Sequence, residues 1–261
     1  MREFHANVFS GLGKITRDAL AGALMGVFAF GVSAHAASSI TGYTDTASSF
    51  GRIGLGGVYY ADSLQGQNLN TLGGFIAISG DEMYKRFKVS LAARFGLGIA
   101  GQERMVGNFE LLPRFGFNIL TQSVPLYVNV IFYYDDRRIV SHGINAAHRS
   151  FGIGGELEGK IPLGQSVALE YGAGYVYDPG LTYRFYPSQN LNLLARAGAA
   201  SSVLAHVGAA FDITDRLHSY VRLSGKYQYL PASPTISHDG MQYFIAAHNV
   251  FSAMIEVGLG F

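Results

Sequence analysis

The amino-acid sequence contains no cysteine, no tryptophan and few charged residues. Because it has no cysteine, the chain can form neither a disulfide framework nor a thiolate metal site. Charged residues make up 14% of its 261 residues, whereas ordinary soluble domains contain roughly 25%. The formal net charge is +1, and this near-neutral balance argues against a nucleic-acid partner, which would need a basic patch.

Glycine and aromatic residues are abundant instead, with 34 Gly, 18 Phe and 16 Tyr. This composition is typical of a chain rich in strands and turns, because aromatic residues favour strands and glycine favours turns. After residue 36, no segment has the roughly 20 consecutive apolar residues of a spanning helix. We therefore do not expect a helical membrane protein.

The first 36 residues have the three parts of a secretory signal peptide. Basic residues come first, the apolar run 19–32 follows, and the small residues Ala34 and Ala36 form an A-x-A cleavage site. The alternative is a membrane anchor, but the run is shorter than the roughly 20 residues that a spanning helix needs. We expect cleavage of the signal peptide 1–36, a polar periplasmic leader over 37–50 and a barrel domain over 51–261.

Most of the mature chain alternates between apolar residues and polar or small ones. In 87–99, large apolar side chains fall on one face, and charged and small side chains fall on the other. Successive side chains of a strand point to opposite faces, so this strict alternation predicts β-strands. The pattern recurs in ten segments, near 51–61, 69–79, 86–99, 108–120, 124–134, 149–162, 166–177, 199–213, 216–229 and 250–261.

The connections between these segments alternate in length. The short ones are 121–123, 163–165 and 214–216, and the long, polar ones are 135–148, 178–198 and 230–249. Short turns at one end and long loops at the other are typical of bacterial outer-membrane barrels. The sequence therefore predicts an all-β fold, a closed antiparallel up-and-down transmembrane β-barrel of ten strands. Eight strands are the fallback if 51–79 pairs differently.

A soluble β-sandwich or lipocalin-like barrel would also alternate, but two features argue against it. The first is that large rings gather at the strand ends beside the long connections, as in the aromatic girdle at a membrane interface. The predicted girdle consists of Tyr59, Phe109, Tyr134, Phe151, Tyr177, Tyr227 and Tyr229. The second feature is a face with charges of both signs along whole strands, which we expect to line the interior.

The predicted interior is crowded and ion-paired. Its residues are Arg52, Lys88, Arg94, Glu110, Arg114, Glu156, Glu158, Lys160, Glu170, His206, Asp212, Arg222, Lys226 and Glu256. Side chains fill the interior of an eight-stranded barrel, and ten strands lie close to that limit. An unpaired buried charge is costly, so we expect a salt-bridged, largely filled lumen with at most a narrow water path. These charges are predicted to be structural rather than a selectivity filter.

The chain ends in "SAMIEVGLGF", an alternating run with a final aromatic ring. This strand resembles the C-terminal signature of Gram-negative outer-membrane β-barrel proteins, which the barrel-assembly machinery reads. Its residues are Phe251, Ile255, Val257, Leu259 and Phe261. The resemblance implies a monomer in the outer membrane, surrounded by outer-membrane lipid and lipopolysaccharide. An even strand count implies periplasmic termini and extracellular loops, which leaves an extracellular ligand open.

Two short motifs raise the question of an enzyme. Ten-strand omptin proteases use acids and a His–Asp pair near the barrel rim, and Asp135, Asp136, His238 and Asp239 could imitate these residues. The omptin acids are two residues apart on one face, whereas Asp135 and Asp136 are adjacent and would point oppositely in a strand. We therefore interpret 135–138 as a solvated loop with local ion pairs.

The second motif, "HRSFG", has the His-x-Ser spacing of outer-membrane lipid A deacylases. Alternation places His148 and Ser150 toward the lumen, where lipid has no access. His142, His148, His238 and His248 lie in or beside long loops without a metal-specific spacing, and no cofactor is expected. We predict a non-enzymatic surface protein with a structural, binding or narrow-pore role. The alternatives are a porin-like channel for small solutes and, after it, an outer-membrane hydrolase.

Overall fold

The computed structural model describes most of the mature chain. The described residues are 48–64, 67–101, 104–121, 123–140, 145–188, 191–214 and 217–261. The predicted signal peptide 1–36 and most of the leader lie outside them, and the first described strand begins at Ser48 rather than at residue 51. Within these ranges, no helix is long and apolar enough to cross a membrane.

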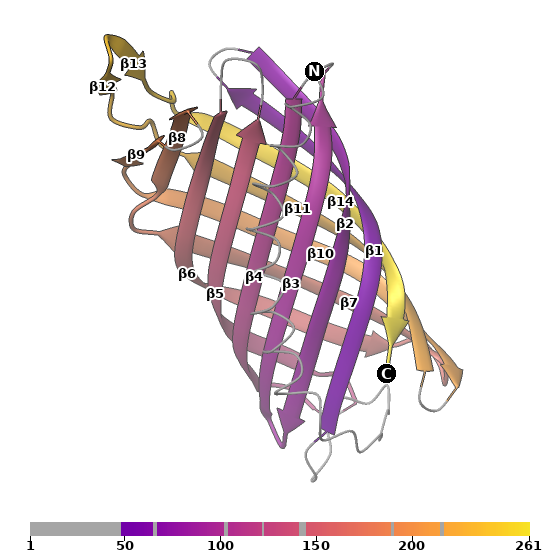
Figure 1. The fold of residues 1–261 in the computed structure, drawn as a ribbon. Helices are drawn as coiled ribbons and strands as arrows, with labels where there is room; N and C mark the ends of the chain where they lie inside the picture. The colour runs from indigo at the N-terminus through magenta and orange to yellow at the C-terminus, as the bar shows by residue number, and fades with distance from the viewer. Residues whose placement is uncertain are drawn as a thin grey trace.

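Ten antiparallel strands close into a barrel (Figure 1). They are β1 (Ser48–Leu64), β2 (Gln67–Tyr84), β3 (Phe87–Ala100), β4 (Arg104–Asn118), β5 (Leu126–Val140), β6 (Asn145–Pro162), β7 (Val167–Asp178), β10 (Ala200–Thr214), β11 (Leu217–Leu230) and β14 (His248–Gly260). Each strand pairs with the next one along this series, and β14 pairs with β1. The predicted ten-strand barrel is confirmed. The eight-strand fallback is wrong, because β1 and β2 pair along their whole length.

Four shorter strands lie at one end of the barrel. They are β8 (Thr182–Ser188), β9 (Leu191–Arg196), β12 (Ile236–His238) and β13 (Met241–Tyr243). The pairs β8–β9 and β12–β13 form hairpins within the long connections, and β8 also pairs with the first residues of β6. We call this the loop end. The opposite end, called the turn end, holds Ser48, Phe261 and the connections β2–β3, β4–β5, β6–β7 and β10–β11, whereas the short connections β1–β2 and β3–β4 lie at the loop end.

One predicted loop is part of the barrel wall. Residues 135–148 were expected to form a long polar connection, but β5 continues to Val140 and β6 begins at Asn145. The error arises because a run of four charges was interpreted as solvated. The charges in fact continue the alternation, with Asp135 and Arg137 buried inside and Asp136 and Arg138 outside.

The strands are strongly staggered around the barrel. A row of hydrogen-bonded neighbours that starts at Arg138 on β5 passes through β4, β3, β2 and β1 and continues around the ring. It returns to β5 at Leu126, twelve residues nearer the turn end. Such a stagger requires strands tilted by roughly 35–45°. Rows of neighbours therefore run diagonally over the barrel surface.

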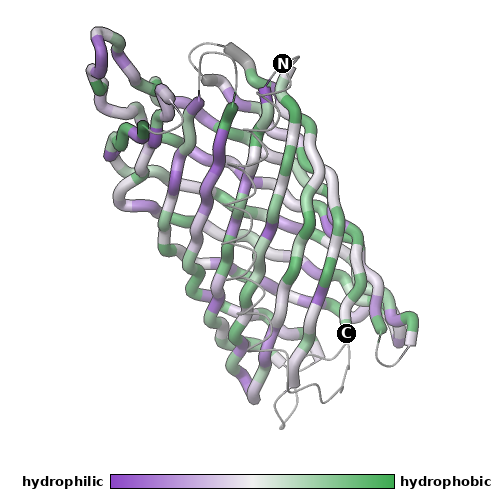
Figure 2. The backbone as a smooth tube through the Cα atoms, viewed as in Figure 1, coloured by the Kyte–Doolittle hydropathy of each residue, from purple (hydrophilic) through white to green (hydrophobic). Residues whose placement is uncertain are grey.

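The outer face is apolar and the inner face is polar. The outward residues of β6 stay apolar or small from Phe151 to Ile161, and those of β14 do so from Phe251 to Phe261. Each stretch spans eleven residues, which matches the 9–11 residues of a tilted transmembrane strand. Leu55 and Leu72 are 61% and 72% exposed. Figure 2 shows apolar and polar residues alternating along the strands. A soluble barrel has the opposite arrangement, because it buries its apolar face.

Candidate functional site

The interior of the barrel is filled by ion pairs between strands that are not neighbours. Nearest the turn end, Glu170 on β7 accepts two hydrogen bonds from Arg52 on β1, one of them at 2.7 Å. Arg222 lies 3.3 Å from the same carboxylate, and Lys160 lies 3.8 Å from it. The strands β1 and β7 are four positions apart in the ring of ten, so the pair crosses the lumen.

A second group of pairs joins β3 and β4 to β6. Lys88 donates to Glu158 at 2.5 Å, and Arg114 donates to Glu156 at 2.7 Å. Asn129 on β5 donates to both carboxylates, at 3.0 and 3.2 Å. A carboxylate with several donors is well compensated for its burial, so these glutamates are suited to a position inside the barrel.

The middle of the lumen is bridged from wall to opposite wall. Lys226 on β11 donates to Glu110 on β4, five positions away in the ring, and to the hydroxyl of Tyr133 at 2.7 Å. Arg94 on β3 lies 3.4 Å from Glu256 on β14 and 3.7 Å from Glu110. These bridges leave little open space around them.

A cavity of about 40 Å³ remains beside these bridges. Its lining includes Arg94, Arg114, Glu156, His206 and Lys226. A cavity needs roughly 10–15 Å³ of this kind to hold one water molecule, so this one is suited to a few waters.

Each of the fourteen predicted interior residues lies within 4.0 Å of an ionisable partner, an acid for each basic side chain and a basic side chain for each acid. The pairs are Arg52–Glu170, Lys88–Glu158, Arg94–Glu110, Arg94–Glu256, Arg114–Glu156, Lys160–Glu170, His206–Glu156, Asp212–His218, Arg222–Glu170 and Lys226–Glu110. The pair of Asp212 and His218 lies between neighbouring strands at the turn end, so it does not cross the lumen.

A further layer of the network, which was not predicted from the sequence, lies toward the loop end. Asp135 is fully buried and lies 3.7 Å from Lys226 and 3.3 Å from His148. Arg137 lies 3.2 Å from Asp62 on β1, and both side chains are at most 2% exposed. Alternation through 135–138 carried the signal for Asp135 and Arg137, but the expectation of a loop hid it.

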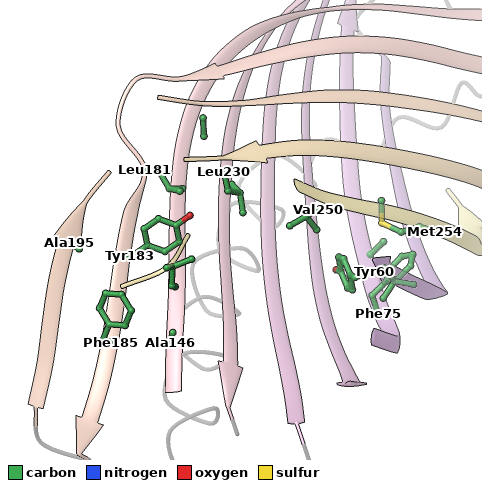
Figure 3. Close-up of a cluster of buried hydrophobic side chains, with 14 residues drawn as sticks. Tyr60, Phe75, Ala146, Leu181, Tyr183, Phe185, Ala195, Leu230, Val250 and Met254 are labelled. Atoms are coloured by element: carbon green, nitrogen blue, oxygen red, sulfur yellow. The ribbon is translucent and has the colours of Figure 1, made fainter. Parts of the chain in front are cut away.

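Apolar side chains form a buried cluster at the loop end (Figure 3). Leu181 and Tyr183, from the connection that holds β8, are 0% and 1% exposed and lie near Leu230 of β11. The Tyr183 hydroxyl donates to the backbone oxygen of Pro231 at 2.8 Å. Ile245, from the connection that holds β12 and β13, belongs to the same cluster. The long connections therefore pack onto the barrel instead of standing free in solvent.

The residues considered for catalysis do not converge. Asp135 points inward, whereas Asp136 points outward and accepts hydrogen bonds from Arg149 at 2.6 and 3.0 Å. His238 lies 3.3 Å from Asp239 in the β12–β13 hairpin, and the Asp239 side chain is 80% exposed. Residues 135–138 belong to strand β5, so the prediction of a solvated loop is wrong. The prediction that Asp135 and Asp136 point in opposite directions is confirmed.

The His-x-Ser motif also lies inside the barrel. His148 and Ser150 are 6% and 3% exposed, and Ser150 donates to Asp178 at 2.6 Å instead of to the histidine. His142 lies outside the described residues. His248 lies 3.7 Å from Asp62 inside the barrel. In the part of the chain that the structure describes, no group of three or more metal-ligating side chains could hold a metal ion.

The predicted girdle and terminal-strand residues lie on the outer face. Phe151, Tyr177, Tyr227 and Tyr229 are 44–63% exposed. Phe109 contacts Tyr134, with ring centroids 5.9 Å apart. The terminal residues Phe251, Ile255, Val257, Leu259 and Phe261 are also exposed outward. Their roles at the membrane interface and in assembly stay predictions.

Comparison with known proteins supports the fold. No family model matches the sequence, and no curated protein is detectably similar to it in sequence. The outer membrane protease OmpT from Escherichia coli has a TM-score of 0.56 at 10% identity, over 84% of this chain and 97% of that one. The chain has the fold of an outer-membrane β-barrel. The translocator domain of the autotransporter NalP from Neisseria meningitidis gives 0.46 at 10% identity, over 95% and 97%.

The class of the protein follows from the fold together with its surface. A closed barrel removes every sheet edge, which is what allows strands to cross a bilayer. The apolar outer belt has the height of a transmembrane strand, and the interior holds the charges. The chain therefore has the closed fold, the apolar outer belt and the charged interior of an outer-membrane β-barrel protein.

Proposed function

We propose that the protein is a closed, non-enzymatic outer-membrane barrel that displays its loop end at the cell surface. In this proposal the β8–β9 and β12–β13 hairpins form the surface for an extracellular ligand, and both ends of the mature chain lie in the periplasm. The observation that carries the proposal is the bridge between Lys226 and Glu110, which joins opposite walls of the lumen. Further pairs fill the levels above and below it.

The energetics support a structural role for these charges. Removing one member of a buried pair leaves an uncompensated charge, which typically costs about 3–5 kcal/mol. A selectivity filter, by contrast, needs charges that face an open water path and remain accessible to passing ions. Here Lys226 and Glu110 are 4% and 6% exposed, and they bind each other.

A narrow channel for small solutes is the second candidate, because the cavity of about 40 Å³ lies in the middle of the lumen among four cations. Single-channel recording of the folded full-length barrel in planar bilayers separates the two candidates. We expect no conductance steps from the unmodified protein. A porin with a known open channel, recorded in the same bilayers, should conduct and so show that the assay can detect an opening. Reproducible steps from the unmodified protein, altered by R94Q or R114Q, would instead establish a channel.

The proposed orientation is testable because the chain has no cysteine. A single cysteine at Ser237, in the β12–β13 hairpin, should react with a membrane-impermeant maleimide on intact cells. A single cysteine at Gln165, exposed in a tight turn at the turn end, should react only after the outer membrane is permeabilised. The reverse labelling pattern would overturn the orientation.

A further inference from the structure

A groove with a volume of about 440 Å³ crosses the outer surface of the barrel over β1 to β5. Its floor consists of Gly56, Phe75, Gly96 and Asn108. The strand registers place these four residues side by side on β1, β2, β3 and β4. The groove therefore follows one of the diagonal rows of hydrogen-bonded neighbours.

Two outward rows form the sides of the groove. One row is built of large apolar residues and ends in an acid: Leu55, Ile76, Phe95, Phe109 and Asp136. The other row is low, because glycines replace large side chains: Gly74, Leu97, Gly107 and Arg138. Gly57, the partner of Gly74 on β1, continues this row beyond the lining of the groove. A Cβ atom on Gly57 or Gly74 would meet no heavy atom closer than 3.5 Å. The glycines thus leave open space on the outer face without being required for packing.

The groove descends from the loop end into the apolar belt. The row through Arg138 and Gly74 reaches β5 again at Leu126, near the turn end, so each step away from β5 moves toward the turn end. Its upper end lies beside Tyr134 and Asp136, where the outer face changes from apolar to charged. Its lower end lies among exposed apolar residues of the outer face, Leu55 and Ile76.

Three arginines surround the upper end of the groove. Arg138 and Arg184 are both cross-strand neighbours of Ala147 and therefore share the outer face. Arg149 pairs with Asp136 at 2.6 Å, and the guanidinium of Arg138 lies 4.6 Å from the ring centre of Tyr186. With Asp136 as the acid among them, the arginines leave a net charge of +2 at this end. The Nε of Arg184 is buried and has no hydrogen-bond partner within the described ranges.

We propose that the groove binds a phosphorylated glycolipid of the outer leaflet, the lipid A part of lipopolysaccharide. One acyl chain lies along the glycine row, and a phosphate lies against Arg138 and Arg184. The guanidinium group matches phosphate oxygens with two parallel hydrogen bonds, and these charge-assisted bonds are stronger than neutral ones. The proposal goes beyond the closed-barrel function and rests on the proposed orientation, which places the loop end in the outer leaflet.

Native mass spectrometry of the detergent-purified full-length barrel can measure this binding. Lipid A, dephosphorylated lipid A and phosphatidylglycerol are titrated in parallel. We expect one tightly bound lipid A for each chain and at least tenfold weaker binding of dephosphorylated lipid A, since losing a charge-assisted hydrogen bond typically costs about that much. Phosphatidylglycerol keeps a phosphate, so its binding relative to lipid A shows how far the site also depends on the glycolipid. Equal binding of all three lipids would overturn the proposed phosphate site.

Variants locate the site on the barrel. Filling the groove with G74L should abolish tight binding of lipid A, and R138A/R184A should weaken it by about tenfold or more. The matched control is G225L, which adds the same side chain to an outward glycine of β11 with its nearest contact at 3.9 Å. Heat-dependent gel mobility checks that each variant folds, and G107L, on the same row of the groove, replaces G74L if it does not.

Two outcomes would refute the groove as the site. One is full binding of lipid A by the folded groove-filling variant, G74L or its replacement G107L, and the other is an equal loss in G225L. The bilayer recordings are independent of this titration. A conducting barrel that still binds lipid A at the groove would refute the closed interior alone, and a silent barrel that lacks tight binding would refute the lipid site alone.

Discussion

Asp62 and Arg137 form the pair that tests most directly how much the interior depends on paired charges. The Arg137 Nη1 lies 3.2 Å from Asp62 Oδ2, and their side chains are 2% and 1% exposed. Apart from this ion pair, the Arg137 nitrogens have no hydrogen-bond partner among the described residues. The guanidinium also lies 4.6 Å from the ring centre of Tyr60. Asp62 is therefore the group that chiefly compensates the charge of Arg137.

We expect D62N to lower the free energy of unfolding by about 3–5 kcal/mol, the usual effect of leaving one buried charge without its partner. The double variant D62L/R137M removes both charges and keeps most of the side-chain volume. Its stability should therefore return to within about 1 kcal/mol of the unmodified protein or exceed it. The contrast between the single and double variants distinguishes loss of charge compensation from simple loss of packing.

Urea unfolding of the barrel in lipid vesicles measures these differences. Because the chain has no tryptophan, unfolding is followed by circular dichroism and by gel mobility. D239N is the control, since the Asp239 side chain is 80% exposed beside His238, and it should leave stability unchanged. A loss below about 1 kcal/mol in D62N, or a double variant as unstable as D62N, would refute this account of the interior.

Two further predictions concern packing. G154L should prevent the barrel from folding, because a Cβ at Gly154 would lie 1.9 Å from the backbone oxygen of Tyr175. The neighbouring G155L, whose Cβ has its nearest contact at 3.8 Å, should fold normally, and heat-dependent gel mobility compares the two. L181A should destabilise the loop end by about 2–5 kcal/mol, since Leu181 is fully buried. Limited proteolysis should then cut this variant faster than L194A, whose parent side chain is 58% exposed; equal rates would contradict the buried cluster.

The strand pattern made the barrel predictable from the sequence. A residue pointing into a narrow barrel and one pointing into lipid have opposite polarity, so the polarity of each residue in a strand indicates which way its side chain points. The terminal strand shows this plainly, with Glu256 buried and Ile255 and Val257 about half exposed. Side-chain direction required only counting by two, and this placed the predicted interior charges on the inner face of the barrel.

Pairing between distant strands could not be predicted in the same way. Nothing in the alternation indicates that Lys226 meets Glu110 rather than another acid, because the choice depends on stagger and on which walls face each other. The outer groove could not be predicted for the same reason. Gly57, Gly74 and Gly107 are unremarkable within their own strands, and only the register places them in one diagonal row.

The adjacent acids of β5 show how alternation places a structural residue inside the barrel and a residue of the proposed binding site outside it. Asp135 points inward, where Lys226, His148 and Gln228 surround it within 3.7 Å. Asp136 points outward to Arg149 at the head of the proposed lipid groove. Shifting the register of β5 by one residue would turn each of its side chains to the other face, and Arg137 would then point outward, away from Asp62. The interior network therefore fixes the register that builds the outer groove. Lipid binding at the groove should then fall in any variant that lets β5 slip.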